Sequence, residues 1–277
     1  MVKGLFNFGN TCYFNAALQC LLQVPQLSNR LLLEDYCGDC EFTHEYQHVV
    51  RQMWHGDKRP DHTKLLGMFR DRYTQFRGPH QQDSQEAFLC LLDILEKSLS
   101  KFIKSVMYTK VLHETVCPSE TTTKYEDTPV TILHSDTSQR LEDILKLQHK
   151  WNILSGYEDS NGNVHNVATT RSMYYEPGRI MVFTIRMYGE KVGVTAPETL
   201  DMFPFLHEKS PHRFESRYEL FALCTHHGSA QGGHYVAYTK HKGQWYLKDD
   251  QMSTKVDTFP QTGYHYILLY KRVNSFH

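Results

Sequence analysis

The sequence lacks an excess of charge of either sign, and it lacks long apolar runs. Its 277 residues include 30 lysines and arginines and 31 aspartates and glutamates, a formal net charge of −1. Proteins that bind nucleic-acid phosphates usually carry a basic excess, so we expect no nucleic-acid partner. No apolar stretch approaches the roughly 20 residues that cross a bilayer, so we expect no membrane partner. Apolar residues make up 40% of the chain, which is enough to form packed cores.

The number of cysteines is odd. The chain has seven cysteines, and no secretory leader precedes Gly4. Disulfide frameworks of secreted proteins use even numbers of cysteines in chains that carry such a leader. We therefore expect free thiols and a reducing compartment, the cytoplasm, the nucleus or both.

The most informative stretch is residues 4–15, which holds Cys12 and, five positions upstream, the amide side chain of Asn7. Apolar residues recur after Cys12 at helical spacing until Pro25, which predicts an amphipathic helix that begins near Thr11. These apolar residues are Phe14, Ala17, Leu18, Leu21 and Leu22. In the first turn of a helix, backbone N–H groups and the helix dipole favour thiolate over thiol. The pattern predicts an activated nucleophile; the alternative is a small buried apolar side chain.

A second group of residues near the other end supplies what a cysteine nucleophile needs. His234 follows a glycine-rich loop and opens an alternating strand, and Asp249 comes 15 residues later. That separation suits a hairpin that returns the carboxylate to the imidazole. Cys12, His234 and Asp249 are therefore candidates for nucleophile, base and orienting group.

With these motifs the chain resembles the ubiquitin-specific proteases, papain-like cysteine peptidases that cleave after the C-terminal glycine of ubiquitin. Four motifs in the family's order carry the resemblance: the cysteine box at 4–22, the acidic motif QQDSQE at 81–86, the histidine box at 226–250 and the last strand at 264–272. The resemblance implies a helical thumb, a β-rich palm and β fingers, with the active site in the cleft between thumb and palm.

The resemblance also implies a role for each residue of the site. Cys12 would be the nucleophile, His234 the general base and then acid, and Asp249 the group that orients His234. Asn7 would donate a hydrogen bond to the tetrahedral oxyanion, and loss of one such donor typically costs about 3 to 4 kcal/mol. Asp250 would be an accessory that helps to position the oxyanion or its water; a solvated acidic turn is the alternative.

A further set of residues would hold the tail of ubiquitin. The resemblance implies that Asp83 and Glu86 pair with arginines of that tail. Simple helix capping is the other interpretation, since the motif directly precedes a helical apolar pattern. The glycine-rich segment 228–233 would cover a channel for the Gly-Gly end, against which Tyr235 could pack. The implied substrate-binding residues are Gln81, Asp83, Glu86, Gln231, Gly233 and Tyr235.

The order of the patterns predicts an α+β fold, because helices precede strands. Residues 11–103 favour helices, among them 43–55 and 61–76. Sheet predominates from residue 106, and the expected strands are 128–133, 179–187, 218–225, 234–241 and 264–272. The polar stretch 158–170 is predicted to be a loop. We expect one catalytic domain over residues 1–277, with the thumb at about 1–103 and the fingers and palm at about 104–277.

Metal binding is the least determined property. Many members of the family carry a fingertip zinc held by two Cys-x-x-Cys pairs, but the finger region here offers only Cys117. We therefore expect that zinc site to be lost, and no cofactor. Cys37, Cys40, His44 and His48 are a second possible zinc-binding group, with a surface turn and free thiols as the alternative.

The sequence therefore predicts a deubiquitinating cysteine peptidase that hydrolyses the peptide or isopeptide bond after the Gly-Gly end of ubiquitin through a thioester. Ubiquitin and ubiquitinated proteins are the expected partners, and a separate activating partner is left open. One alternative is a protease for another ubiquitin-like modifier, since other modifiers also end in Gly-Gly. The other is a catalytically silent ubiquitin-binding module.

Overall fold

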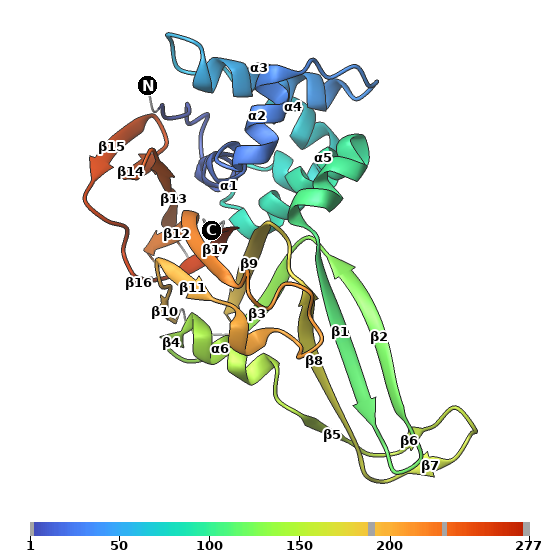
Figure 1. Ribbon diagram of the computed structural model, residues 1–277. Coiled ribbons are helices and arrows are strands. Elements are labelled where there is room, and N and C mark those ends of the chain that lie inside the picture. The colour runs from blue at the N-terminus through green and yellow to red at the C-terminus, as the bar shows by residue number, and fades with distance from the viewer. Residues whose placement is uncertain (1–2, 188–191, 229–231, 274–277) are drawn as a thin grey trace.

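The computed structural model describes residues 3–187, 192–228 and 232–273 (Figure 1). Helices dominate the first part of this chain and strands the rest, which confirms the predicted α+β class. The helices of the first part are α1 (Cys12–Leu22), α2 (Pro25–Leu33), α3 (Glu41–Trp54), α4 (Thr63–Arg72), the short 3-10 helix η1 (Thr74–Arg77) and α5 (Ser84–Met107). Among the described residues, no helix combines the length and apolarity needed to span a bilayer.

Helix α1 is the centre of the thumb. Every one of its residues is buried, as expected for a helix that is enclosed on all sides. It packs against α5 on one side and against strand β13 (Gly233–His241) of the palm on the other. The first residue of α1, Cys12, therefore lies where the thumb meets the palm.

The predicted helices differ from the observed ones at their ends. The helix predicted at 61–76 is divided, since α4 ends at Arg72 and η1 follows. Asp61 lies outside α4 because its carboxylate accepts hydrogen bonds from the backbone N–H (3.0 Å) and hydroxyl (2.6 Å) of Thr63. Pro25 does not only end the first helix: it also begins α2, where its missing N–H costs nothing.

The palm is one large sheet with strand order β15-β14-β13-β12-β17-β9-β3, and β11 pairs with β12 at its side. Neighbouring strands are antiparallel except β3 and β9, which are parallel. The strands other than β13 are β3 (Thr131–Ser135), β9 (Ile180–Met187), β11 (Thr199–Asp201), β12 (Arg217–Gly228), β14 (Gln244–Asp249), β15 (Met252–Val256) and β17 (His265–Arg272). All five predicted strands agree with observed ones to within three residues at each end; the strand predicted at 128–133 is observed at 131–135.

Alternation along the palm strands gives the sheet two apolar faces. On β17, Ile267 and Leu269 join the core shared with α1 and α5, whereas Leu268 and Tyr270 join a second core on the opposite face. Helix α6 (Leu141–Gln148) covers this second core, although sequence patterns predicted mainly sheet in its region. Eight residues are too few to give a clear helical period.

The fingers extend away from the palm as a separate sheet (Figure 1). Its strand order is β2-β1-β8-β5, and a short β6–β7 hairpin lies near the far end. These strands are β1 (Thr109–Val116), β2 (Thr121–Thr128), β5 (Asn152–Leu154), β6 (Tyr157–Glu158), β7 (Val164–His165) and β8 (Ala168–Glu176). The predicted loop at 158–170 is only partly correct: six of its thirteen residues belong to β6, β7 and β8, and the other seven lie in turns and irregular segments.

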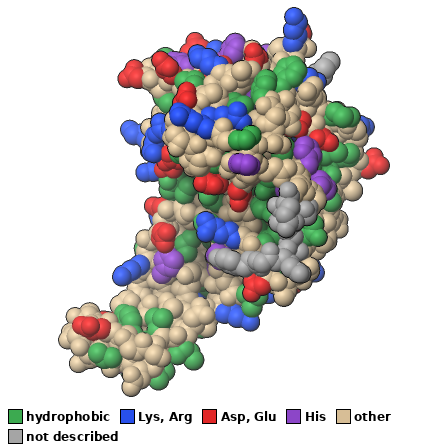
Figure 2. Space-filling model, turned by 180° about the vertical axis from the view of Figure 1, so that it is seen from behind, with side chains coloured by type: hydrophobic (Ala, Val, Ile, Leu, Met, Phe, Trp, Pro, Cys, Tyr) green, Lys and Arg blue, Asp and Glu red, His purple; other side chains and the backbone are tan. Residues whose placement is uncertain are grey.

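A few short elements complete the chain. These are β4 (Gln139–Arg140), β10 (Val194–Thr195), β16 (Thr262–Gly263) and the 3-10 helix η2 (Phe203–Phe205). Figure 2 shows the molecule from behind, with acidic and basic side chains interspersed over the body above the fingers. The division of residues 1–277 into thumb, fingers and palm of a single domain stays a prediction.

Candidate active site

The loop before α1 folds back on the start of that helix. The side-chain oxygen of Asn7 accepts hydrogen bonds from the backbone N–H of Gly9 (2.9 Å) and of Thr11 (3.3 Å). Gly9 and Asn10 have left-handed backbones, with φ of 85° and 50°, which allows the tight reversal. Asn7 is thereby held beside the helix terminus that carries Cys12, whose side chain is buried at 3% exposure.

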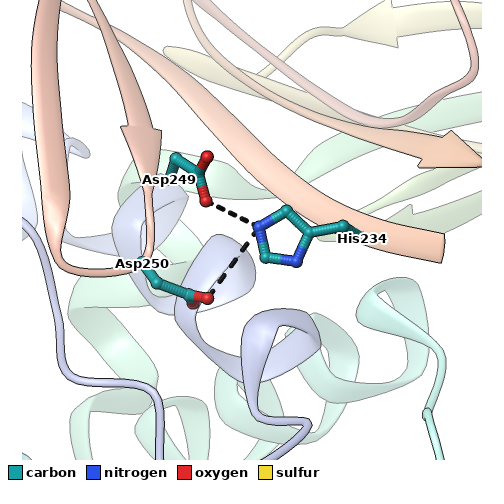
Figure 3. Close-up of side chains that lie close together, drawn as sticks. All are labelled: His234, Asp249 and Asp250. Carbon is teal, nitrogen blue, oxygen red and sulfur yellow. Dashed lines mark hydrogen bonds and ion pairs between the residues drawn. The ribbon is translucent and has the colours of Figure 1, made fainter.

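His234 and Asp249 are joined by the β13–β14 hairpin, as the sequence predicted. A two-residue turn at Lys242 and Gly243, both with positive φ, reverses the chain between the strands. The ring Nε2 of His234 then lies 2.6 Å from Asp249 Oδ1 (Figure 3). Because this contact uses Nε2, the other ring nitrogen, Nδ1, is left for Cys12.

The surroundings of His234 favour its charged form. A hydrogen bond with Cys12, and then the one with Asp249, raise the pKa of His234 to about 9, although partial burial of the ring acts in the opposite direction. The side chain is 38% exposed. An imidazolium next to a thiol is the arrangement that supports a thiolate nucleophile.

Asp250 is held by two side-chain amides. Its Oδ2 accepts a hydrogen bond of 2.6 Å from Asn7 Nδ2, and its Oδ1 accepts one of 2.7 Å from Asn15 Nδ2. The carboxylate is 12% exposed, and Oδ2 lies 3.8 Å from His234 Nε2 (Figure 3). This geometry does not fit the alternative of a solvated acidic turn.

His234, Asp249 and Asp250 form the one group of potential metal ligands found among the described residues, with ligand atoms within 4.8 Å of one another. Both oxygens of Asp250 already accept amide N–H groups, and Asp249 accepts from the imidazole. The three side chains are therefore arranged as hydrogen-bond partners rather than as metal ligands.

The second possible zinc group is not assembled. His44 Nε2 lies 2.7 Å from the backbone oxygen of Gly38, and His48 Nε2 lies 2.7 Å from Gln52 Nε2. With each histidine turned to a different neighbour, Cys37, Cys40, His44 and His48 do not form a ligand group in the part of the chain that the structure describes.

At the fingertip, a carboxylate occupies the centre of a hydrogen-bonded cluster. Asp159 Oδ2 accepts from His165 Nε2 (2.9 Å) and from Ser119 Oγ (2.7 Å), while Oδ1 accepts from the backbone N–H of Asn161 and Asn163 (both 2.9 Å). These bonds, the one from His165 first, hold the pKa of Asp159 well below its ordinary value. Cys117 Sγ contacts only the edge of this cluster, at Ser119 Oγ (3.2 Å). One thiol and a saturated carboxylate do not fit a four-ligand zinc site.

Two of the predicted tail-binding residues lie at the start of α5. Asp83 caps this helix by accepting from the Gln85 backbone N–H at 2.6 Å, and burial raises the pKa of its carboxyl group. Glu86 Oε1 accepts from Gln75 Nε2 at 3.3 Å. Asp83 and Glu86 together line a cavity of about 480 Å³ whose wall includes Arg186.

The other predicted tail-binding residues lie at the start of β13. The side-chain amide of Gln81 donates to the backbone oxygen of Gly233 and accepts from its N–H at 3.2 Å. A Cβ on Gly233 would lie 2.0 Å from the ring of His226, so only glycine fits there. Tyr235 is 8% exposed and packs edge-on against Tyr266. Gln231 lies outside the described residues.

Sequence reasoning did not single out Asn15 and His62 and gave Gly4 no role of its own. A Cβ on Gly4 would lie 2.3 Å from the backbone oxygen of Asp250. Asn15 is a polar residue within the apolar pattern that follows Cys12, and that contrast was a usable signal. His62 directly precedes α4 and belongs to no motif or apolar pattern, so nothing in the sequence indicated a role for it.

The family described as "Ubiquitin carboxyl-terminal hydrolase" matches residues 3–270. The chain is similar to "Ubiquitin carboxyl-terminal hydrolase 17-like protein 5" of Homo sapiens, with 25% identity over 284 residues that cover 89% of this chain and 51% of the relative. A second human relative, 17-like protein 6, has the same identity and is covered to 68%. The chain thus spans about half the length of most of the curated relatives reported.

Solved structures show the same architecture. The "SAGA DUB module" of Ubp8, Sgf11, Sus1 and Sgf73 bound to monoubiquitin matches with a TM-score of 0.87 and 19% identity, over 99% of this chain and 69% of that chain. The same module bound to ubiquitin aldehyde matches equally well, over 70% of that chain. The match confirms the α+β, papain-like fold that the sequence predicted.

Proposed function

The chain belongs to the ubiquitin carboxyl-terminal hydrolase family, and on that premise we propose that it is a deubiquitinating cysteine peptidase. Its substrate would be the peptide or isopeptide bond after the Gly-Gly end of ubiquitin, and its partners ubiquitin and ubiquitinated proteins. The titles of the two structural matches, which name monoubiquitin and ubiquitin aldehyde as bound molecules, support this substrate. Because the nucleophile must stay a thiol, we also propose a reducing compartment, the cytosol or the nucleus.

In the first half of the reaction, Cys12 Sγ attacks the carbonyl carbon of the last glycine. His234 holds the thiol proton, and Asp249 fixes the ring so that one nitrogen faces Cys12. The carbonyl oxygen becomes an oxyanion that the Asn7 amide stabilises. When the tetrahedral intermediate collapses, His234 gives the proton to the leaving lysine amine, and ubiquitin stays on Cys12 as a thioester.

In the second half, a water molecule takes the place of the amine. His234 accepts its proton as the hydroxide oxygen bonds to the thioester carbon, and the Asn7 amide again faces the oxyanion. Collapse breaks the carbon–sulfur bond and frees the carboxylic acid of ubiquitin, which loses its proton to the solvent, and Cys12 and the protonated His234 return to their starting state. No other protein group is required, since His234 and the solvent accept and supply all the protons.

The tail of ubiquitin would lie between α5 and β13. Asp83 and Glu86 are exposed and line a cavity there, so arginines of the tail could pair with them, and such pairs are strong when both carboxylate oxygens accept hydrogen bonds. Gln81 and Gly233 are hydrogen-bonded to each other where β13 begins, and they would border this path. Two consecutive glycines suit such a path, because they let the backbones approach closely.

The observation that carries the proposal is that the imidazole of His234 is hydrogen-bonded both to Asp249 and to Cys12. The test is release of a fluorophore from the C-terminus of ubiquitin by the full chain. We expect turnover by the wild type and by Cys37→Ser, a matched control whose cysteine is exposed, and none by Cys12→Ser.

Other outcomes identify the alternatives. Turnover of reporters built on other ubiquitin-like proteins, with none on ubiquitin, would make another modifier the substrate. Retained binding of ubiquitin without turnover or alkylation of Cys12 would indicate a binding module. Full activity of Cys12→Ser would refute the mechanism.

A further inference from the structure

We propose that Asn15 and His62 are positioning residues that hold Asp250, and through it the Asn7 amide, in the orientation that stabilises the oxyanion. The inference rests on the proposed function. The four side chains form one continuous hydrogen-bonded series from the buried interior of the thumb to the start of α1.

Asn15 is the central member of the series. It is 2% exposed, and its Nδ2 donates both of its hydrogens, to Asp250 Oδ1 at 2.7 Å and to the backbone oxygen of Phe6 at 3.0 Å. Both of these partners are acceptors, so the amide cannot be turned over without placing oxygen against oxygen. Its Oδ1 must therefore face His62.

His62 fixes the remaining atom of Asn15. The ring is fully buried, and its Nε2 lies 3.0 Å from Asn15 Oδ1. Since Oδ1 can only accept, Nε2 carries the hydrogen. Burial lowers the pKa of His62 to about 4, so the ring is neutral near pH 7. It stacks on Phe14 at 10° between planes, with 6.1 Å between centroids, which prevents rotation of the donor.

Asp250 needs this support because its own conformation is unfavourable. Its φ is 45°, a left-handed value that non-glycine residues rarely adopt. Its carboxylate lies 3.8 Å from the His234 ring, which carries positive charge. Without the bond from Asn15, the carboxylate is drawn towards the charged ring of His234 and no longer holds Asn7.

Burying a polar pair at this position costs free energy, and the packing of the core does not require polar side chains there. A buried histidine and a buried asparagine each lose hydration, and an apolar pair of similar volume would fill the same space. Their bonds lead to Asp250 and the Phe6 backbone, both of which belong to the walls of the site. The series therefore has a positioning role beyond filling the core.

The test compares His62→Phe, which keeps the ring and loses the donor, with His62→Gln, whose amide can restore it. On the ubiquitin–fluorophore reporter we expect kcat to fall by about tenfold in His62→Phe, with KM unchanged, and to recover in His62→Gln. The rate at which iodoacetamide alkylates Cys12 at neutral pH should not fall, because alkylation forms no oxyanion and His234 stays charged. If His62→Phe does not fold, Asn15→Ala takes its place, and the same changes in kcat, KM and alkylation rate are expected.

The decisive comparison repeats His62→Phe in an Asn7→Ala background. If His62 acts through Asn7, the second substitution costs less than about twofold there. An equal loss in both backgrounds, or a slower alkylation of Cys12, would overturn the inference. The titration of the His234 imidazole can be followed by NMR without turnover. It should move to higher pH in His62→Phe. An unchanged titration would contradict the proposed role of the hydrogen-bonded series. Failure of the proposed function is distinct, since the wild type itself would then be inactive.

Discussion

The side-chain amide of Asn7 donates a 2.6 Å hydrogen bond to Asp250, a residue 243 positions later in the chain. The Asn7 oxygen is meanwhile bound to the backbone of Gly9 and Thr11. One amide N–H then has no partner among the described residues. This is the N–H that the proposed mechanism directs at the oxyanion, so the contact joins the N-terminal loop and the palm into one catalytic wall.

Asn7→Ala should lower kcat by about 100- to 1,000-fold, because it removes one donor to the oxyanion. Binding of ubiquitin and the thermal midpoint of unfolding should change little, since Asn7 lies in a loop outside the apolar core. Steady-state kinetics with the ubiquitin–fluorophore reporter measures the effect. A loss that appears only in KM would assign Asn7 to substrate binding instead.

Gly4→Ala should lower turnover by at least tenfold, because the new Cβ would lie 2.3 Å from the backbone oxygen of Asp250 and 2.4 Å from that of Gln251. Backbone atoms cannot move aside as a side chain can, so Asp250 is displaced. The matched control is Gly67→Ala, within α4, where a Cβ meets nothing within 4 Å and alanine favours the helix. Equal activity of the two variants would contradict the role given to Gly4.

The alkaline side of the pH profile should report on His234, whose pKa is raised from an ordinary 6.5 to about 9 by Cys12 first and also by Asp249. We expect kcat/KM to fall above about pH 9, as the Cys12 and His234 pair loses its proton. Asp249→Asn should move this limb to lower pH. An unmoved limb would show that Asp249 does not support the imidazolium.

The raised pKa of His234 also makes the free energy of unfolding depend on pH. A pKa that is raised in the folded state stabilises the fold fully below about pH 6.5, and this contribution is lost as pH rises through about 9. Urea unfolding of the wild type and of Cys12→Ser, from pH 6 to pH 10, measures it. The variant lacks the largest cause of the shift, so its stability should decline less over this range.

Asp83→Asn should raise KM for ubiquitin several-fold with little change in stability, since asparagine still caps α5 but carries no charge. Asp83→Ala should raise KM similarly and also lose about 1 kcal/mol of stability, because the cap is gone. Glu86→Gln is the companion variant without a capping role. If Asp83→Asn left KM unchanged while Asp83→Ala only destabilised the chain, Asp83 would be a cap alone.

Asp159→Ala should loosen the fingertip, because five hydrogen-bond donors lose their acceptor. Amide hydrogen exchange in β6, β7 and the start of β8 should become faster, with the exposed Asp136→Ala as control. Since the pKa of Asp159 lies below its ordinary 3.8 in the folded chain, its contribution is present above that pH and is lost as pH falls further. Unchanged exchange would show that the cluster does not hold the hairpin.

Local patterns were enough to predict several parts of the site. Helical spacing after Cys12 located α1, and strand alternation with a hairpin return paired His234 with Asp249. Both depend on residues near in sequence, whose period of 3.6 or 2 is written directly in the chain. The short α6 and the divided α4 escaped prediction because their boundaries depend on caps and on burial against the palm.

The sequence by itself determined the fold class, the nucleophile's helix and the residues from which a catalytic group could be chosen. Tertiary structure alone decided that Asp250 turns to Asn7 and Asn15, that His62 stands behind them, and that Tyr235 lies buried. These choices join residues from separate elements, and they follow from the need of each buried polar atom for a partner. No period along the chain encodes that need, because the partner is set by which elements pack together.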